Sequence, residues 1–231
     1  MAEQEPTRRE RIRRRTVAEI KAAAMDQVRE SGSESLSLNA IARTMAMSMA
    51  ALYRYFDSRD ALLADLAVDV HLDLAEALEA AAGRPASPVA RVRAVANAYR
   101  EWALAHPHAY RLAHGSTHGS GRDHAGDRIV PAAQRSMAVL LAVVAEVGRP
   151  SGPPVPAGLE RQILRWNSGG HHDLPVDVLR FGLVWWSRLH GLISLELGEH
   201  LAATGIDPAL LYEGEVDAML AGVGHRYGAT A

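Results

Sequence analysis

A dense group of arginines lies near the start of the chain. Six of the eight residues from Arg8 to Arg15 are arginine, and guanidinium groups bind phosphate through paired N–H donors. Residues 1–60 hold 11 Arg or Lys against 9 Asp or Glu, whereas the whole chain has a formal net charge of −2. A basic end on a mildly acidic body is typical of a protein that docks on phosphate through that end. The alternative is a charged helix start that is only solvated.

Other chemistries have little support. The chain has no Cys, which excludes disulfides, thiolate metal sites and a thiol nucleophile. Lys21 is the single lysine, and no glycine-rich loop precedes it. No strand precedes the Gly119–Gly121 segment, so its serine does not form a nucleophile elbow. We therefore expect no enzymatic activity and no cofactor.

Histidine is abundant, with 11 residues. His114 and His118 are four residues apart, a spacing that suits a metal on a helix face, but Gly115 between them predicts that the helix ends there. His190 is better explained as a hydrogen-bonded structural residue. We predict no metal site. The sequence does not indicate what role, if any, the His-rich segment 106–124 has.

The elements that must position the arginines are predicted to be helices. Apolar residues recur at steps of three and four from about residue 10 to 30, which indicates a helix that ends near Gly32. Three serines are placed to cap the next three helices: Ser37, Ser48 and Ser58. Only Ala46 and Met47 separate the first two of these helices, so they must cross at a tight turn.

The remaining pattern also predicts helices. They are expected at 88–105, 107–114, 127–147, 159–167, 175–202 and 208–224, with no strand. We predict an all-α protein with a disordered basic tail (1–9), a three-helix helix-turn-helix DNA-binding domain (10–58) and a larger helical bundle (59–226). The longest apolar run, 137–145, is too short to cross a bilayer, and no secretory signal is visible, so a cytoplasmic location is expected.

Two short helices that cross at a tight turn leave the second one projecting, and a helix fits the major groove of DNA. Met49 and Ala50 are expected to touch thymine methyl groups, and exposed helix N-termini bind phosphate. Base-edge or phosphate contacts are expected from the remaining candidates. The predicted DNA-binding residues are Arg13, Ser37, Arg43, Ser48, Met49, Ala50, Tyr53, Arg54, Tyr55 and Arg59. Burial or simple solvation remains the alternative for each of them.

The run SLNAIARTMAMSMAALYRYFDSRDALL, residues 37–63, resembles the TetR family of transcriptional regulators. The Ile41-Ala42 pair, the Met47-Ser48 step and the Leu52–Phe56 run fall at the spacings of that family. Three positions depart from it: Ala46 replaces a turn Gly, Ala50-Ala51 replace Gly-Thr, and Arg59 replaces Lys. Because the recognition helix has few base-reading side chains, we expect the Arg8–Arg15 segment to contribute more than usual.

The C-terminal half contains two strongly apolar helices. Residues 186–201, WSRLHGLISLELGEHL, resemble the C-terminal effector and dimerisation domain of one TetR subgroup, which implies a homodimer. A helix that is apolar almost all round needs partners on several sides. The predicted dimerisation residues are Trp186, Ile193, Leu197, Tyr212, Val216 and Met219.

The resemblance also implies a small-molecule pocket in the body of the protein. The candidate lining residues are Tyr99, Trp102, Tyr110, Met137, Leu141, Phe181 and Trp185. Ordinary core packing is the alternative for each, and the few charges among them favour a mostly apolar effector. The resemblance thus implies a TetR-like regulator, a repressor released from a palindromic operator by its effector. The alternative is a helical small-molecule- or metal-binding protein with a degenerate DNA-binding end.

Overall fold

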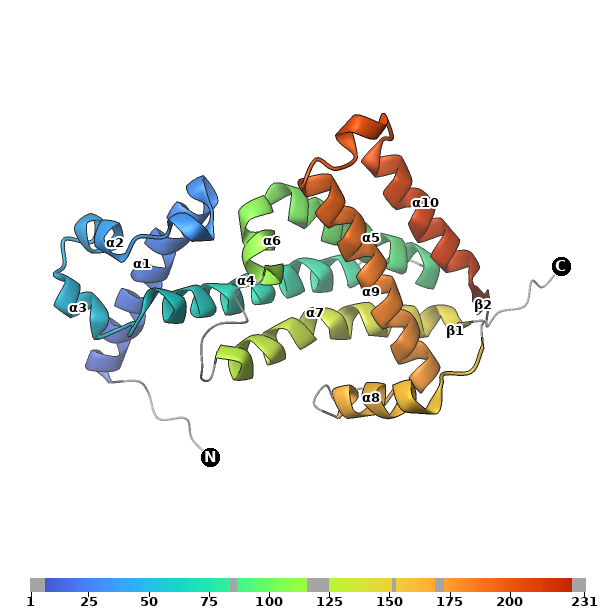
Figure 1. Cartoon of the computed structure of the whole chain (residues 1–231). Coiled ribbons are helices and arrows are strands. Elements are labelled where there is room, and N and C mark those ends of the chain that lie inside the picture. The colour runs from blue at the N-terminus through green and yellow to red at the C-terminus, as the bar shows by residue number, and fades with distance from the viewer. Residues whose placement is uncertain (1–6, 84–86, 116–124, 151–152, 169–172, 226–231) are drawn as a thin grey trace. The chain divides into compact units, whose positions relative to one another are not determined.

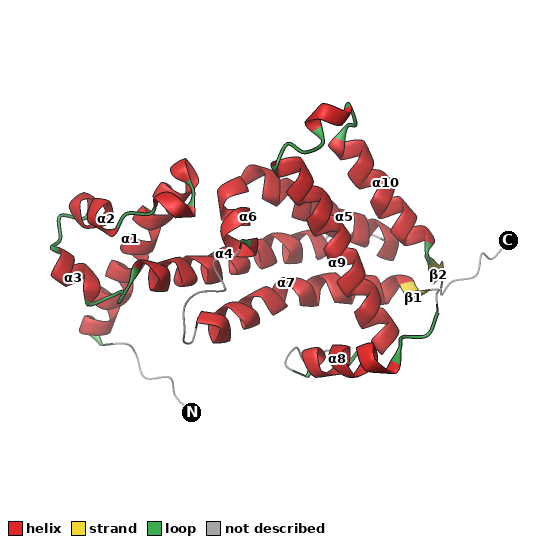
Figure 2. Cartoon of the chain, in the orientation of Figure 1, coloured by secondary structure: helices red, strands yellow, loops and turns green. Residues whose placement is uncertain are grey.

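A computed structural model describes residues 7–83, 87–115, 125–150, 153–168 and 173–225. Helices make up nearly all of its regular structure (Figures 1 and 2). The N-terminal elements are α1 (Arg8–Ser31), the 3-10 turn η1 (Ser33–Ser35), α2 (Leu38–Thr44), α3 (Met49–Tyr53) and α4 (Arg59–Ala82). The later elements are α5 (Pro88–Ala105), α6 (Pro107–His114), α7 (Ala125–Val147), α8 (Ala157–Asn167), α9 (Val176–Leu197), the 3-10 turn η3 (Ala202–Thr204) and α10 (Pro208–Ala221). The predicted all-α class is confirmed.

Two short strands were not predicted. β1 (Gly148–Pro150) pairs antiparallel with β2 (Val223–His225), with Arg149 opposite Gly224 (Figure 2). Each strand has three residues, which is too short to show an alternating pattern in the sequence. The pair joins the end of α7 to the segment that follows α10, and leaves the helical class unchanged.

The first helix begins earlier than predicted. Thr7 caps α1: its hydroxyl accepts the Glu10 backbone N–H at 3.3 Å, and the Glu10 carboxylate accepts the Thr7 N–H at 2.7 Å. This reciprocal capping box satisfies two otherwise unpaired N–H groups. Arg8 and Arg9 are therefore helical, which corrects the disordered tail predicted for residues 1–9; residues 1–6 lie outside the described residues.

Two C-terminal helices end earlier than predicted. α9 ends at Leu197 rather than near 202, because Glu199 takes a positive φ of 57°, which breaks the helical backbone. α10 ends at Ala221 rather than near 224, and β2 follows. At their starts, α7 and α8 each begin two residues earlier than predicted, at Ala125 and Ala157.

The chain divides into two compact units. One comprises Met1–Val70 with His106–Ile129, and the other His71–Ala105 with Val130–Ala231. The first unit therefore extends beyond the predicted 10–58 domain, because α6 packs on the end of α1. There Gly32 has a φ of 79°, and a Cβ added to it would lie 3.5 Å from Nδ1 of His108.

In the first unit, the apolar stripe of α1 is fully buried at Ile20, Ala24 and Val28. Lys21 donates from Nζ to the Asp69 carboxylate at 2.5 Å, which joins α1 to α4. Removing these apolar side chains from water stabilises the unit, at about 25 cal/mol per Å² of buried apolar surface. The helix-turn-helix is thereby held on a rigid support.

In the second unit, α5, α9 and α10 are joined by polar contacts around an apolar core. Arg100 on α5 forms a two-pronged ion pair with Glu196 on α9, at 2.8 and 2.5 Å. The Tyr212 hydroxyl on α10 donates to the Ala96 carbonyl at 2.7 Å. Gly182 lets α9 approach α7, because an added Cβ would lie 2.3 Å from Leu141. These contacts fix the three helices against one another.

Helix α7 contains the one segment of the described residues that is long and apolar enough to match a bilayer. It spans Arg128–Val147 with a mean hydropathy of 1.4. A core helix of a water-soluble protein meets the same criterion, and the α7 side chains Leu140, Leu141, Val143 and Val144 are buried. A single helix of this kind is weak evidence for a membrane span.

Candidate nucleic-acid interface

The turn between α2 and α3 has the tight geometry that the sequence predicts. The Met47 N–H donates to the Ala42 carbonyl at 2.9 Å, and the Ala46 N–H donates to the Arg43 carbonyl at 3.1 Å. Ala46 takes a φ of 51°, in the region that favours glycine. The alanine at this position is therefore strained, as the sequence departure at Ala46 suggested for a turn with positive φ.

The capping serines and the buried face orient α3. Ser48 accepts the Ala51 N–H at 3.2 Å, and Ser37 accepts the Ala40 N–H at 3.3 Å. Leu52 is fully buried and fixes the inner face of the helix. Both serine caps are confirmed as structural features.

The opposite face of α3 is open. Ala50, Tyr53 and Arg54 are exposed, Tyr53 to 48% of its surface, while Met49 is half-buried. The exposed Tyr53 ring adds both apolar surface and a hydroxyl group to this face. This short helix therefore presents a mixed apolar and polar edge of the size that enters a major groove.

Arg13 connects α1 to the end of α3. Its guanidinium carbon lies 5.4 Å from the centre of the Tyr55 ring, and Nη1 donates to the Arg54 carbonyl at 3.4 Å. A cation over an aromatic ring is attracted to its negative face. Arg13 and Tyr55 thus form a brace between the first helix and the recognition helix.

Arg59 has a different position from the one predicted. Its Nη2 donates to the carbonyls of Ser33 and Glu34, at 2.5 and 3.0 Å. Its Nε donates to the Leu36 carbonyl at 3.1 Å. These donors fasten the α1–α2 connection to the start of α4, so the structure gives Arg59 a structural role, and its phosphate contact stays a prediction.

Several cations near α3 are available to an external anion. The guanidinium groups of Arg8, Arg9, Arg43 and Arg54 are exposed and form no ion pair within the described part of the chain. By contrast, Arg15 pairs with Glu19 at 2.8 Å. At the start of α1, the Thr7 N–H holds the pKa of the Glu10 carboxyl below its ordinary value. The capping box is therefore intact at neutral pH.

Comparison with known proteins agrees with this geometry. Residues 20–66 match the family described as bacterial regulatory proteins, tetR family, and residues 92–219 match the tetracyclin repressor-like C-terminal domain. An HTH-type transcriptional regulator of Mycobacterium tuberculosis is 30% identical over 93% of this chain and 94% of its own length. The chain belongs to the TetR family. It is a helix-turn-helix transcriptional regulator of that family.

Solved structures support the same assignment over the whole TetR chain. The crystal structure of regulatory protein SCO4313 has a TM-score of 0.76 and 37% identity, covering 93% of this chain and all of the other. A protein of unknown function from Rhodococcus sp. RHA1 has a TM-score of 0.68 and 27% identity, covering 90% and 95%. The similarity therefore includes both the DNA-binding end and the helical body.

Most of the predicted ligand-binding residues of this TetR protein lie in the core. Tyr99, Tyr110 and Leu141 are buried, and Trp102 donates from Nε1 to the Asp73 carboxylate at 2.8 Å. Met137 packs on the apolar cluster formed by Leu141, Ile163 and Leu179. These five residues have packing roles here, because their spacing also fits the buried stripe of a helix. Their burial and packing agree with the core-packing alternative, and a contact with ligand stays a prediction for them.

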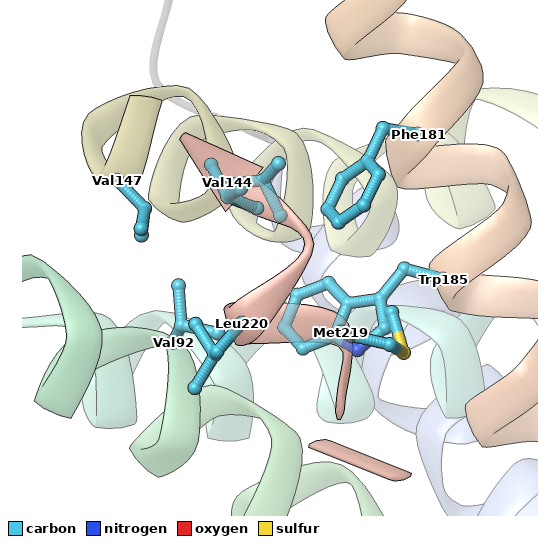
Figure 3. Close-up of a pocket in the computed structure, with 8 residues that line it drawn as sticks. Val92, Val144, Val147, Phe181, Trp185, Met219 and Leu220 are labelled. Carbon is cyan, nitrogen blue, oxygen red and sulfur yellow. The ribbon is translucent and has the colours of Figure 1, made fainter. Parts of the chain in front are cut away.

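Phe181 and Trp185 do line a pocket. The apolar pocket of the second unit is formed by Val92, Val144, Val147, Phe181, Trp185, Met219, Leu220 and Val223. Figure 3 shows Phe181 and Trp185 projecting from α9 toward Val144 and Leu220. Its volume of about 10 Å³ is roughly the space of one water-sized group. The six other lining residues were not predicted, because they come from the ends of four separate elements.

Most of the predicted dimerisation residues are buried within a single chain. Ile193, Tyr212, Val216 and Met219 are buried within their own chain, Ile193 completely. Trp186 stacks on His190 with ring centres 5.4 Å apart, and Leu197 is half-buried. The buried stripes of α9 and α10 serve the core because α5 covers them.

The opposite faces of α9 and α10 remain open. Exposed apolar residues on these faces and the preceding turn are Val184, Leu195, Ile206, Leu210 and Leu211. Gly191 and Gly214 lie on the same faces, and a Cβ added to either would meet no atom within 4 Å. Glycine inside a helix is unfavourable relative to alanine by about 1 kcal/mol. This chain's own packing requires neither glycine, a signal that the sequence alone does not reveal.

The histidines do not gather into a recognisable metal centre among the described residues, where no group of three or more His, Asp or Glu side chains is placed to hold an ion. His114 lies at the end of α6 and contacts the Tyr110 ring, with centres 4.7 Å apart. His118, His124, His171 and His172 lie outside the described residues. His190 has the structural environment that was predicted: its Nδ1 lies 3.4 Å from the Tyr99 hydroxyl.

Proposed function

We propose that this TetR-family protein is a repressor that binds a palindromic operator as a homodimer and is released by a small-molecule effector. The observation that carries the proposal is the open face of α3, braced against a basic first helix. A projecting helix of this kind enters the major groove, and twofold symmetry places two of them about 34–36 Å apart on DNA. The protein is proposed to be a cytoplasmic regulator without enzymatic activity.

The proposed DNA contacts are of two kinds: contacts to base edges and contacts to backbone phosphates, which anchor the protein. Met49, Ala50 and Tyr53 meet base edges or thymine methyl groups, with Arg43 and Arg54 beside them. Ser37 and Ser48 present helix N-termini to phosphates. Arg8 and Arg9 extend the anchoring surface along α1, while Arg13 positions Tyr55 and the end of α3. The proposed DNA-binding domain begins at Arg8 rather than at residue 10, and the remaining boundaries stay as predicted.

The open faces of α9 and α10 are proposed to pair with a second copy. Exposed leucines flank glycines that need no space within their own chain. Two helices from each subunit would form a four-helix interface with the glycines at the close crossing. The proposed interface residues are therefore Val184, Leu195, Leu210 and Leu211. They take the place of the earlier candidates Ile193, Tyr212, Val216 and Met219, which are buried within their own chain.

A gel-shift titration against the DNA upstream of the protein's own gene tests the proposal. The expected result is a discrete complex whose log affinity falls linearly with log salt, because bound phosphates release counterions. A Tyr53→Ala variant should weaken this complex, whereas Leu159→Ala, an exposed site on α8, should not. The absence of any sequence-preferring complex would favour the alternative, a helical ligand-binding protein with a degenerate DNA-binding end.

A further inference from the structure

The indole of Trp185 has a buried donor without an acceptor. Trp185 is 1% exposed, and no hydrogen-bond acceptor for its Nε1 is present among the described residues. Buried N–H groups nearly always have a partner, so an orphan of this kind calls for an explanation. By contrast, Trp102 in the same unit satisfies its Nε1 with Asp73.

This donor belongs to a wall of the apolar pocket. Trp185 lines the pocket together with Phe181 and Met219, and no charged side chain contributes to the lining. In the view of Figure 3 the side chains of Trp185 and Met219 overlap, and both residues line the pocket. Met219 is unbranched and its side chain adapts easily to a changed volume. A movement of Met219 would therefore enlarge the pocket and uncover the indole N–H together.

We propose that the apolar pocket binds a neutral, compact apolar molecule that carries one hydrogen-bond acceptor, such as a ketone, and that this acceptor pairs with Trp185 Nε1 after Met219 moves aside. The lining provides apolar surface and a single donor, so it disfavours a charged ligand, whose desolvation no side chain would offset. A site of few polar groups in an apolar wall is the usual form of a small-molecule pocket.

The short strand pair offers the route of entry. Val147 immediately precedes β1 and Val223 begins β2, and both line the pocket. A pairing of three residues per strand is only marginally stable by itself, so the two strands can separate at a small cost in free energy. The ligand would enter where the end of α10 meets the end of α7.

The identification of this ligand as the effector rests on the proposed function, but its binding does not. The test therefore uses the full chain without DNA. Acetophenone and α-methylstyrene have nearly the same shape, and only the former carries an acceptor oxygen. Titration calorimetry should give acetophenone about a tenfold lower Kd, the effect of one hydrogen bond to a donor that is otherwise unpaired.

Two variants locate the effect. In Trp185→Phe the ring remains but the N–H is lost, so the tenfold preference should vanish, whereas the neighbouring Trp186→Phe should keep it. Met219→Ala should increase the affinity for acetophenone more than that for α-methylstyrene. This variant tests the proposal if Trp185→Phe does not fold. Equal affinities in the native chain, no binding of either compound, or a preference that survives in Trp185→Phe would overturn the proposal. A separate gel shift of the ligand-free protein tests the proposed operator binding, so the two proposals can fail independently.

Discussion

Arg13 lies over the ring of Tyr55, with 5.4 Å between the guanidinium carbon and the ring centre, and donates to the carbonyl of the adjacent Arg54. The two residues are separated by the whole of α2 and α3 in the sequence. Their contact makes the angle between α1 and the end of α3 a fixed property of the domain. The part of the basic segment around Arg13 therefore packs against the end of α3.

Replacing Arg13 by Ala should reduce operator affinity by about two- to fivefold, the usual strength of an exposed cation–π contact. If Arg13 positions α3 and does not bind phosphate, the salt dependence of log affinity should keep its slope. Tyr55→Leu should give the same result, and Arg29→Ala, at the far end of α1, should change neither quantity. A slope reduced by about one in Arg13→Ala would show instead that Arg13 binds phosphate directly.

The double variant Arg8→Ala, Arg9→Ala tests the anchoring role of the first helical turn. The Thr7–Glu10 capping box remains in this variant, so the helix start is preserved. If both guanidinium groups neutralise phosphates, the salt slope should fall by about 1.8, since each contact contributes about 0.9. Arg15→Ala, which removes a group already paired with Glu19, is the matched control. Unchanged affinity and slope at fixed salt would show that the segment is only solvated.

Ala46→Gly should stabilise the protein. Ala46 has a φ of 51°, and the left-handed conformation is unfavourable for a residue with a Cβ by about 1–2 kcal/mol. Part of this gain is lost because glycine is more flexible in the unfolded chain. We expect a net increase of about 1 kcal/mol in the unfolding free energy by urea titration. Ala50→Gly, within α3, should instead decrease it, and the opposite order would contradict the strain at Ala46.

The helix-turn-helix could be predicted closely from the sequence, because caps, turn length and apolar spacing are local signals. Ser37 and Ser48 cap the helices that their positions predict. The role of Arg59 could not be predicted, since its acceptors are backbone carbonyls about 25 residues earlier in the chain. The burial of the predicted dimerisation residues could not be predicted for a related reason. α10 is apolar on both sides, and periodicity alone does not say which side its own chain covers.

His190 predicts a pH dependence of stability. Burial lowers the pKa of this imidazole from its ordinary value of 6.5. Below that value the unfolded chain binds a proton that the folded chain binds less readily, so the unfolding free energy should fall as pH decreases. Urea titrations between pH 7.5 and about 5 should show this decline. The His190→Gln variant should show a smaller decline, whereas His200→Gln, an exposed histidine, should behave like the native chain.

Substitutions at Gly191 and Gly214 test whether the open faces of α9 and α10 form the dimer interface. A Cβ added at either position would meet no atom within 4 Å in its own chain, so the leucine variants should fold and gain helix propensity. At a close helix crossing the same side chains would separate the two subunits. Sedimentation equilibrium should therefore show at least a tenfold weaker dimer for Gly191→Leu and Gly214→Leu. Gly158→Leu on α8, also open to solvent, is the control; an undiminished dimer in both test variants would place the subunit contact on another face.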